Sequence, residues 1–110
     1  FLWVGFYNVK NNMLVLGPFQ GPVACTRIEK GKGVCGKAWE QKNSVIVDNV
    51  DDFPGHIACN SKSKSEIVVP LIKECQVIGV LDIDSEQLAA FDSEDLLFIN
   101  EICEWFVNTL

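Results

Sequence analysis

The sequence predicts an α+β domain in which one antiparallel sheet has helices packed on it. Strand-like segments come in consecutive pairs joined by short turns, whereas the two helix-like segments stand apart from those pairs in the chain. The chain has 110 residues, which is near the usual size of one domain, and its hydrophobic content of 48% is enough to form a packed core. We therefore expect residues 1–110 to form a single domain.

Six segments have the composition of strands, with alternating or continuous apolar residues between turn signals. They are residues 1–9, 13–19, 23–28, 44–50, 66–72 and 76–84. Tight turns at 10–12 and 73–75 join the first pair and the last pair into hairpins, so these strands are expected to be antiparallel. Residues 51–64 form a polar loop between the fourth and fifth strands.

Two segments are expected to be helices. The first, residues 34–41, follows a glycine-rich turn, and the second begins at Asp92 or Ser93, which are both suited to cap a helix. Apolar residues spaced by three and four follow in the second segment: Leu96, Ile99, Cys103, Phe106 and Leu110. This spacing is typical of a helix with one face in the core.

Charge and cysteine content exclude several classes of protein. The net charge of −6 and a pI near 4.6 argue against a nucleic-acid partner, which requires clustered lysine and arginine. No apolar run approaches the roughly 20 residues needed to cross a bilayer. Five cysteines without the spacing of a disulfide scaffold favour a reducing, cytoplasmic location. The absence of an initiator methionine leads us to expect a chain cropped at its N-terminus.

Three acidic residues are expected on one face of the last hairpin. Asp82 and Asp84 lie two residues apart in one strand, with Ile78 and Val80 on their face, and Glu66 shares its face of the partner strand with Val68 and Pro70. These carboxylates are either solvated strand ends or an acidic pocket for a cation. Because crowded carboxylates repel one another, at least one is expected to have a raised pKa and to serve as a general acid.

The first strand has two aromatic residues on one face. Trp3, Gly5 and Tyr7 share that face, whereas Leu2, Val4 and Phe6 share the other. The glycine is expected to leave a hole between the two aromatic rings. The alternative is an ordinary aromatic core with a glycine kink.

Three of the five cysteines, Cys25, Cys35 and Cys59, lie in the polar, turn-rich part of the chain, which suggests reactive thiols. Cys35 falls in the first turn of an expected helix, where the helix dipole would lower a thiol pKa. Cys59 lies in a loop from which it could approach either of the others. Two nearby thiols can form a sulfenic acid and then a disulfide.

Two other uses of these cysteines are less favoured. Zinc would need Cys25, Cys35, His56 and Cys59, of which only the last two form a closely spaced pair. A cysteine protease would need His56 as its base, but no nucleophile motif surrounds any cysteine. Structural positions are expected for Cys75 and Cys103, in a turn and in a helix core.

The sequence resembles the free methionine-(R)-sulfoxide reductases, a family of GAF-fold enzymes. The likeness extends over nearly the whole chain and is most specific around the three cysteines and in the segment Leu81-Asp82-Ile83-Asp84-Ser85. It implies a GAF-like single antiparallel sheet with flanking helices, without the N-terminal helical region of that family, and it leaves a homodimer open. A GAF sensor or binding module without catalysis is the alternative, because fold does not determine function.

The resemblance also implies the chemistry. The substrate would be free methionine-(R)-sulfoxide, and thioredoxin would be the reductant, with no metal or organic cofactor. Cys59 matches the attacking cysteine in one account of the family and Cys25 the cysteine that forms the disulfide, whereas another account assigns the attack to Cys35. The implied substrate-binding residues are Trp3, Tyr7, Glu66, Asp82 and Asp84.

Overall fold

The computed structural model describes residues 2–22, 25–56 and 62–110. Its strands form one antiparallel sheet with the order β3-β2-β1-β6-β5-β4. They are β1 (Trp3–Lys10), β2 (Met13–Gln20), β3 (Arg27–Glu29), β4 (Val45–Val47), β5 (Ser65–Lys73) and β6 (Gln76–Ser85). The helices are α1 (Gly33–Gln41), the 3-10 turn η1 (Val50–Asp52) and α2 (Ser93–Asn108). The predicted α+β fold is confirmed.

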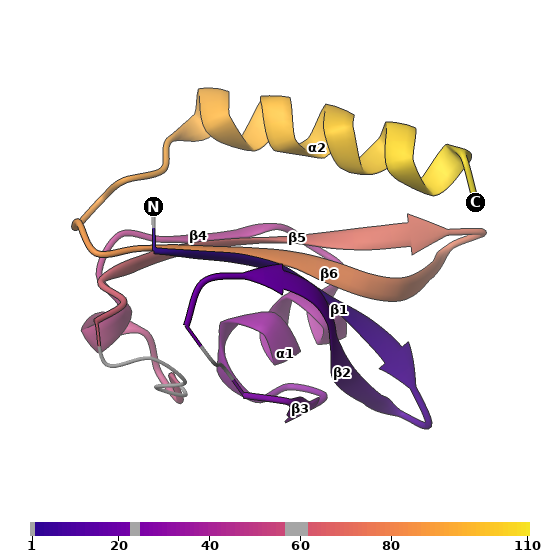
Figure 1. Ribbon diagram of the computed structural model, residues 1–110, viewed down its shortest axis with the longest axis horizontal. Coiled ribbons are helices and arrows are strands. Elements are labelled where there is room, and N and C mark those ends of the chain that lie inside the picture. Colours follow the sequence, from indigo (N-terminus) through magenta and orange to yellow (C-terminus); the bar gives the residue numbers. More distant parts are fainter. Residues whose placement is uncertain (1, 23–24, 57–61) are drawn as a thin grey trace.

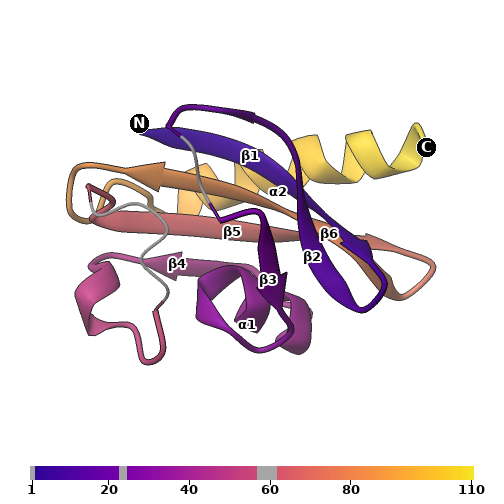
Figure 2. The ribbon, with the colours of Figure 1, turned by 60° about the horizontal axis from the view of Figure 1, so that its bottom comes forward.

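The sheet separates the two α-helices. In Figure 1, α2 lies along one face of the sheet, and α1 lies on the opposite face with β3 beside it. Figure 2 shows α1 between β3 and β4, where the curled sheet closes around it. The order of the strands places β6 between β1 and β5, so the first and last hairpins lie side by side.

Both predicted hairpins are present, and their turns have the backbone conformation that such turns need. Asn11 and Asn12 have φ of 51° and 66°, and Glu74 and Cys75 have φ of 52° and 67°. Two successive residues with positive φ match the right-handed twist of the flanking strands. The strands therefore pair without a longer loop.

Two expected strands are shorter in the structure. The expected strand at 23–28 is reduced to β3 (Arg27–Glu29), with residues 23–24 outside the described part of the chain. The expected strand at 44–50 ends at Val47, because η1 follows it, with Asn49 accepting a hydrogen bond from the Asp51 amide. The end of the expected strand is therefore replaced by the capped turn η1.

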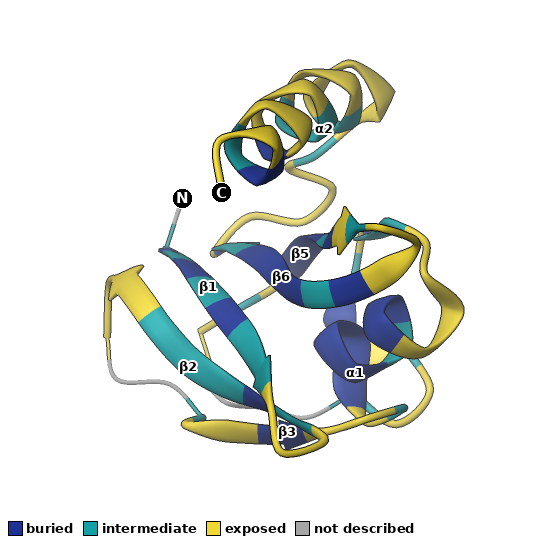
Figure 3. Cartoon of the chain, turned by 90° about the vertical axis from the view of Figure 1, so that its right-hand side faces the viewer, coloured by how far each residue is buried: buried dark blue, intermediate teal, exposed yellow. Residues whose placement is uncertain are grey.

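The sheet has a separate hydrophobic core on each face. The α1-side core contains Trp3, Tyr7, Leu14, Ile28, Val34, Cys35, Ala38, Trp39, Val47, Val50, Val68, Val77 and Val80. The α2-side core contains Ile67, Val69, Leu71, Leu81, Cys103 and Val107. Burial is plainly unequal between the helices, since α1 is largely buried and the outer surface of α2 is exposed (Figure 3).

One β-bulge changes the predicted faces of β6. Leu71 pairs with Gly79, but Ile72 pairs with Val77, which leaves Ile78 without a directly opposite residue. As a result Val77 joins the α1-side core and Ile78 packs against the α2-side core, the reverse of the predicted arrangement. Beyond the bulge the predicted alternation holds.

The final helix begins where it was predicted, but the last of its residues in the core is not the predicted one. Asp92 and Asp95 form a capping box, in which each side chain accepts a hydrogen bond from the other residue's backbone amide. Leu110 was expected in the core, but it lies beyond the helix and is exposed. Val107 is buried instead. In the part of the chain that the structure describes, no helix is long and apolar enough to cross a membrane.

Candidate active site

The last hairpin brings three carboxyl groups together on the α1 side of the sheet. Glu66 pairs with Asp84, and Val68 pairs with Asp82, in the antiparallel register of β5 and β6. The side chains of Glu66 and Asp82 are buried, and that of Asp84 is half-buried. The predicted convergence is confirmed, whereas the alternative of solvated strand ends is wrong.

Burial sets the protonation of these carboxyl groups. It raises the pKa of Asp82 to about 7 and that of Asp84 to about 8, and it raises the pKa of Glu66 well above its usual value. Repulsion between neighbouring carboxylates, which the sequence suggested as the cause, adds to this effect but is second to burial. The site can therefore hold protonated carboxyl groups at neutral pH.

Cys35 lies directly against the carboxyl groups. It is in the first turn of α1, and its Sγ is 4.0 Å from Oε2 of Glu66, across 31 positions of sequence. Burial, followed by the charges of Asp82 and Glu66, raises the pKa of the Cys35 thiol well above its ordinary value. The expectation that the helix dipole lowers this pKa is wrong, because desolvation and adjacent carboxylates have the larger effect.

The aromatic residues of β1 complete one wall of the site. Trp3 and Tyr7 are both buried, with ring centroids 6.0 Å apart, and Trp3 also stacks on Phe19 at 5.8 Å. A Cβ on Gly5 would overlap the Trp3 indole, so the predicted hole beside this glycine is filled by the ring itself. The glycine is needed because it lets Trp3 lie flat across its own strand.

Tyr7 connects this wall to the cysteines. Its hydroxyl donates a hydrogen bond of 2.8 Å to the backbone carbonyl of Cys25, and burial raises the pKa of Tyr7. Cys25 is half-buried and takes part in a disulfide bond. Cys59 lies outside the described residues, so its predicted place near the site stays a prediction. Of the described cysteines, Cys35, Cys75 and Cys103 have free thiols.

His56 is a neighbour of the site that sequence reasoning considered only for zinc or protease chemistry. Its Nε2 is 3.8 Å from Oε1 of Glu66, and burial lowers its pKa. The position of a histidine in a polar loop gave no signal of this contact, because Glu66 lies ten positions away on a strand. The 3.8 Å separation is longer than a hydrogen bond, so the imidazole lies at the edge of the site without a direct hydrogen bond to Glu66.

Two buried polar atoms at the site have no hydrogen-bond partner among the described residues, the indole Nε1 of Trp3 and Oδ1 of Asp82. Buried polar atoms are normally paired, and an unpaired one needs an explanation. One atom is a donor and the other belongs to a carboxyl group, so together they suit a small polar ligand.

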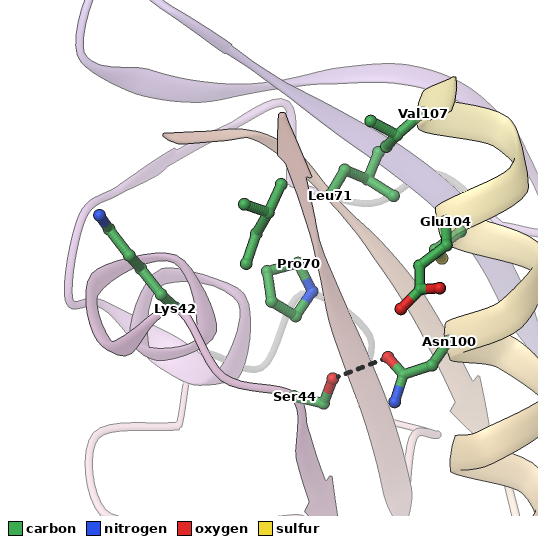
Figure 4. Close-up of a pocket in the computed structure, with 9 residues that line it drawn as sticks. Lys42, Ser44, Pro70, Leu71, Asn100, Glu104 and Val107 are labelled. Carbon is green, nitrogen blue, oxygen red and sulfur yellow. Dashed lines mark hydrogen bonds between the residues drawn. The ribbon is translucent and has the colours of Figure 1, made fainter. Parts of the chain in front are cut away.

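A separate cavity of about 330 Å³ lies on the opposite side of the sheet, between α2 and the end of β5. Figure 4 shows Lys42, Ser44, Asn100 and Glu104 around it, with Ser44 donating a hydrogen bond of 3.3 Å to Asn100. None of the predicted site residues lines this cavity. The predicted site residues that the structure describes lie on the α1 side of the sheet instead.

Comparison with known proteins shows the family of this chain. The GAF domain model matches residues 1–105. The chain belongs to the GAF-domain family. It is 58% identical over 109 residues to GAF domain-containing protein A of Dictyostelium discoideum, covering 98% of this chain and 69% of that protein. It is 52% identical over 93 residues to the free methionine-R-sulfoxide reductase of Escherichia coli K12, covering 84% of this chain and 56% of that protein.

Solved structures give the same relationship. The free methionine-R-sulfoxide reductase of Neisseria meningitidis in complex with its substrate matches with a TM-score of 0.92 and 56% identity, covering 94% of this chain and 63% of that one. The enzyme of Staphylococcus aureus in complex with substrate matches with a TM-score of 0.92 and 47% identity, covering 97% and 70%. Within the GAF family, the chain belongs with the free methionine-R-sulfoxide reductases. It spans between 56% and 69% of the lengths of its curated relatives.

Proposed function

We propose that the protein reduces free methionine-(R)-sulfoxide to methionine by a cysteine thiol mechanism, with thioredoxin as the reductant. The observation that supports this most strongly is the meeting of Cys35, three acidic residues and two aromatic rings on one side of the sheet. The family relationship supports the same reaction. Thioredoxin, a cytoplasmic location and a homodimer stay predictions of the resemblance.

The acidic residues would recognise the free amino acid. An ammonium group is stabilised by buried carboxylates such as Glu66 and Asp84, and an internal methionine of a polypeptide has no such group. The wrong substrate would leave these carboxyl groups without a partner, which is a strong source of discrimination. Trp3 and Tyr7 would contact the S-methyl group.

The substrate carboxylate would bind the first turn of α1. This helix begins after Lys32 without a side-chain cap, and the free backbone amides of a first turn attract anions. The first turn contains the backbone amides of residues 33–36. The Gly36 amide already donates a hydrogen bond of 2.9 Å to the Lys32 carbonyl, so the amides of residues 33–35 are the proposed donors to the substrate carboxylate.

A protonated carboxyl group would activate the sulfoxide. Since the pKa of Asp82 is about 7 and that of Asp84 about 8, each can hold a proton near neutral pH and donate it to the sulfoxide oxygen. Protonation of that oxygen makes the substrate sulfur more electrophilic. The same proton would be unavailable on an exposed aspartate with an ordinary pKa.

The cysteines would then transfer the oxygen. The Cys59 thiolate attacks the substrate sulfur and forms a transient bond to it. The protonated sulfoxide oxygen then moves as hydroxyl from the substrate sulfur to the Cys59 sulfur, and the bond between the two sulfurs breaks, so that methionine leaves and Cys59 is a sulfenic acid. The Cys25 thiol attacks the Cys59 sulfur, which releases water and forms a disulfide. A dithiol of thioredoxin reduces this disulfide to two thiols and is itself oxidised. The sum is one sulfoxide and one dithiol converted into methionine, water and one disulfide.

The environment of Cys35 favours a supporting role in this scheme over the attack itself. A thiol whose pKa is raised stays neutral at physiological pH and is a poor nucleophile. Cys25, which is disulfide-bonded in this structure, matches the proposed resolving cysteine. These two observations support the assignment of the attack to Cys59.

Replacing the proposed nucleophile tests the function. We expect Cys59→Ser to abolish turnover of free methionine-(R)-sulfoxide in an assay coupled to thioredoxin and thioredoxin reductase. Cys75→Ser is the matched control, because Cys75 is exposed in the turn between β5 and β6 and should keep full activity. Wild-type turnover by Cys59→Ser would refute the assignment.

A count of thiols separates catalysis from binding. Without thioredoxin, a catalyst should lose two thiols for each methionine formed, whereas a GAF module that only binds the sulfoxide should lose none. Mass spectrometry of the protein after one turnover would identify the linked pair. A Cys25–Cys59 linkage is expected, and a linkage that includes Cys35 would contradict the scheme.

A further inference from the structure

Cys35, Glu66 and Asp82 form a compact set of ligand atoms that the reductase scheme does not fully use. One ligand atom from each residue lies within 4.8 Å of the other two. The residues are 4%, 6% and 5% exposed, so all three are more than nine-tenths buried. They are held by α1, β5 and β6, and side chains on such regular elements are positioned more firmly than side chains on loops.

The distances suit a metal ion that binds sulfur and oxygen together. Zinc–sulfur bonds are about 2.3 Å and zinc–carboxylate bonds about 2.0–2.2 Å, so sulfur and oxygen on one ion lie at most about 4.5 Å apart. The 4.0 Å between Sγ of Cys35 and Oε2 of Glu66 is within that limit. Every pair among the three ligand atoms lies within 4.8 Å, which is close to that limit.

A second observation points independently to a ligand at this place. Oδ1 of Asp82 is buried and has no hydrogen-bond partner among the described residues. Nε2 of His56 lies 3.8 Å from the other oxygen of Glu66, Oε1. Oδ1 of Asp82 is thus available to an ion, and an ion bound between Cys35 and Oε2 of Glu66 would replace the thiol hydrogen that Cys35 donates to that oxygen.

We propose that Cys35, Glu66 and Asp82 form a zinc-binding site. The thiolate selects a borderline-soft ion over calcium or magnesium, and zinc also accepts carboxylate oxygens as ligands. Three protein ligands leave the fourth tetrahedral position to water. This set differs from the one considered from the sequence, because Cys25 is in a disulfide and cannot offer a thiolate in this form of the protein.

Zinc at this site would inhibit the proposed reductase, and this consequence alone rests on the proposed function. The ion would hold Asp82 as an ionised ligand, so Asp82 could not donate a proton to a sulfoxide. It would also occupy the space proposed for the substrate ammonium. Binding of the ion itself requires no catalysis.

Cobalt binding tests the site without substrate. Co²⁺ is a spectroscopic substitute for zinc, and a thiolate ligand produces a charge-transfer absorption in the near ultraviolet. We expect this absorption in the wild-type protein with Cys25 in its disulfide, and its loss when Zn²⁺ is added. Cys35→Ser should abolish it, whereas Cys75→Ser and Cys103→Ser should leave it unchanged.

Asp82→Asn provides the second variant, because it has nearly the same shape and should fold. We expect its dissociation constant for Zn²⁺ to be at least tenfold higher than that of the wild-type protein, measured by calorimetry. Retention of the cobalt–thiolate absorption in Cys35→Ser, or unchanged zinc affinity in Asp82→Asn, would overturn the proposal. Loss of the absorption in Cys25→Ser or Cys59→Ser would also overturn it, since the ion would then be bound by the loop cysteines. Because no sulfoxide is present, failure here leaves the reductase proposal untouched.

Discussion

The two faces of the sheet are built from the same strands and have opposite chemistry. On the α2 side, β5 and β6 contribute Ile67, Val69 and Leu81 to an apolar core. On the α1 side the alternating residues include Glu66 and Asp82, which are equally buried but ionisable. Both faces therefore carry a hydrophobic core, and the α1 side in addition accepts the electrostatic cost of buried carboxyl groups. Buried polar groups of this kind are typical of functional sites.

A carboxylate on the apolar face should have the largest effect on stability. Val69 is buried in the α2-side core, and Val69→Asp would place a carboxyl group among the apolar side chains of that core. We expect a loss of more than about 4 kcal/mol in the free energy of unfolding, enough to unfold a domain of this size. Urea unfolding measures this free energy, and Val69→Ala is the control for the packing that is lost with the valine side chain. A folded, stable Val69→Asp would contradict the contrast between the faces.

Removing a carboxylate from the reactive face should affect activity instead. We expect Asp82→Asn to lower kcat/KM for free methionine-(R)-sulfoxide about 100-fold, because the amide can neither donate the carboxyl proton nor pair with the ammonium group. Its melting temperature should equal or exceed that of the wild-type protein, since a buried repulsive group is gone. Asp84→Asn should act in the same direction. Wild-type kinetics in both variants would contradict the proposal that Asp82 and Asp84 belong to the active site.

The pH dependence of stability should come from the reactive face. A carboxyl group whose pKa is higher in the folded than in the unfolded protein binds its proton more tightly when folded. Its stabilising effect is complete below the unfolded value of 3.8 and is lost as the pH rises towards about 7 for Asp82 and about 8 for Asp84. We expect the melting temperature, measured by thermal unfolding, to fall as the pH rises from 5 to 8. The fall should be smaller in Asp82→Asn than in the wild-type protein. A melting temperature that rises over this range would contradict the raised pKa values.

The smallest effect is expected from the buried thiol of the apolar face. Cys103 lies in the α2-side core, where burial raises its pKa to about 11, so it is a neutral packing residue at physiological pH. Cys103→Ala should cost about 1 kcal/mol of stability through lost packing and leave turnover unchanged. Reductase assays and urea unfolding of the same sample measure both. A large loss of activity would show that the faces are coupled.

Strand alternation explains how much of the site was predictable. Placing Glu66 on the face of Val68, and Asp82 and Asp84 on the face of Val80, required only the period of two in a strand. The same rule failed at Val77 and Ile78, because a bulge depends on the register with β5 and not on the segment itself. It also missed the filling of the space over Gly5, which depends on the rotamer of Trp3.

By itself, the sequence determined the order of the elements, the two hairpins and the acidic face of the last one, because turns and periodicity are local properties of the chain. The tertiary structure decided the protonation of the site. A helix N-terminus alone lowers a thiol pKa, but folding buries Cys35 against Glu66 and Asp82, and burial raises it. Only the packing of α1 on β5 and β6 brings these groups together, since an electrostatic environment depends on distances that sequence separation does not contain.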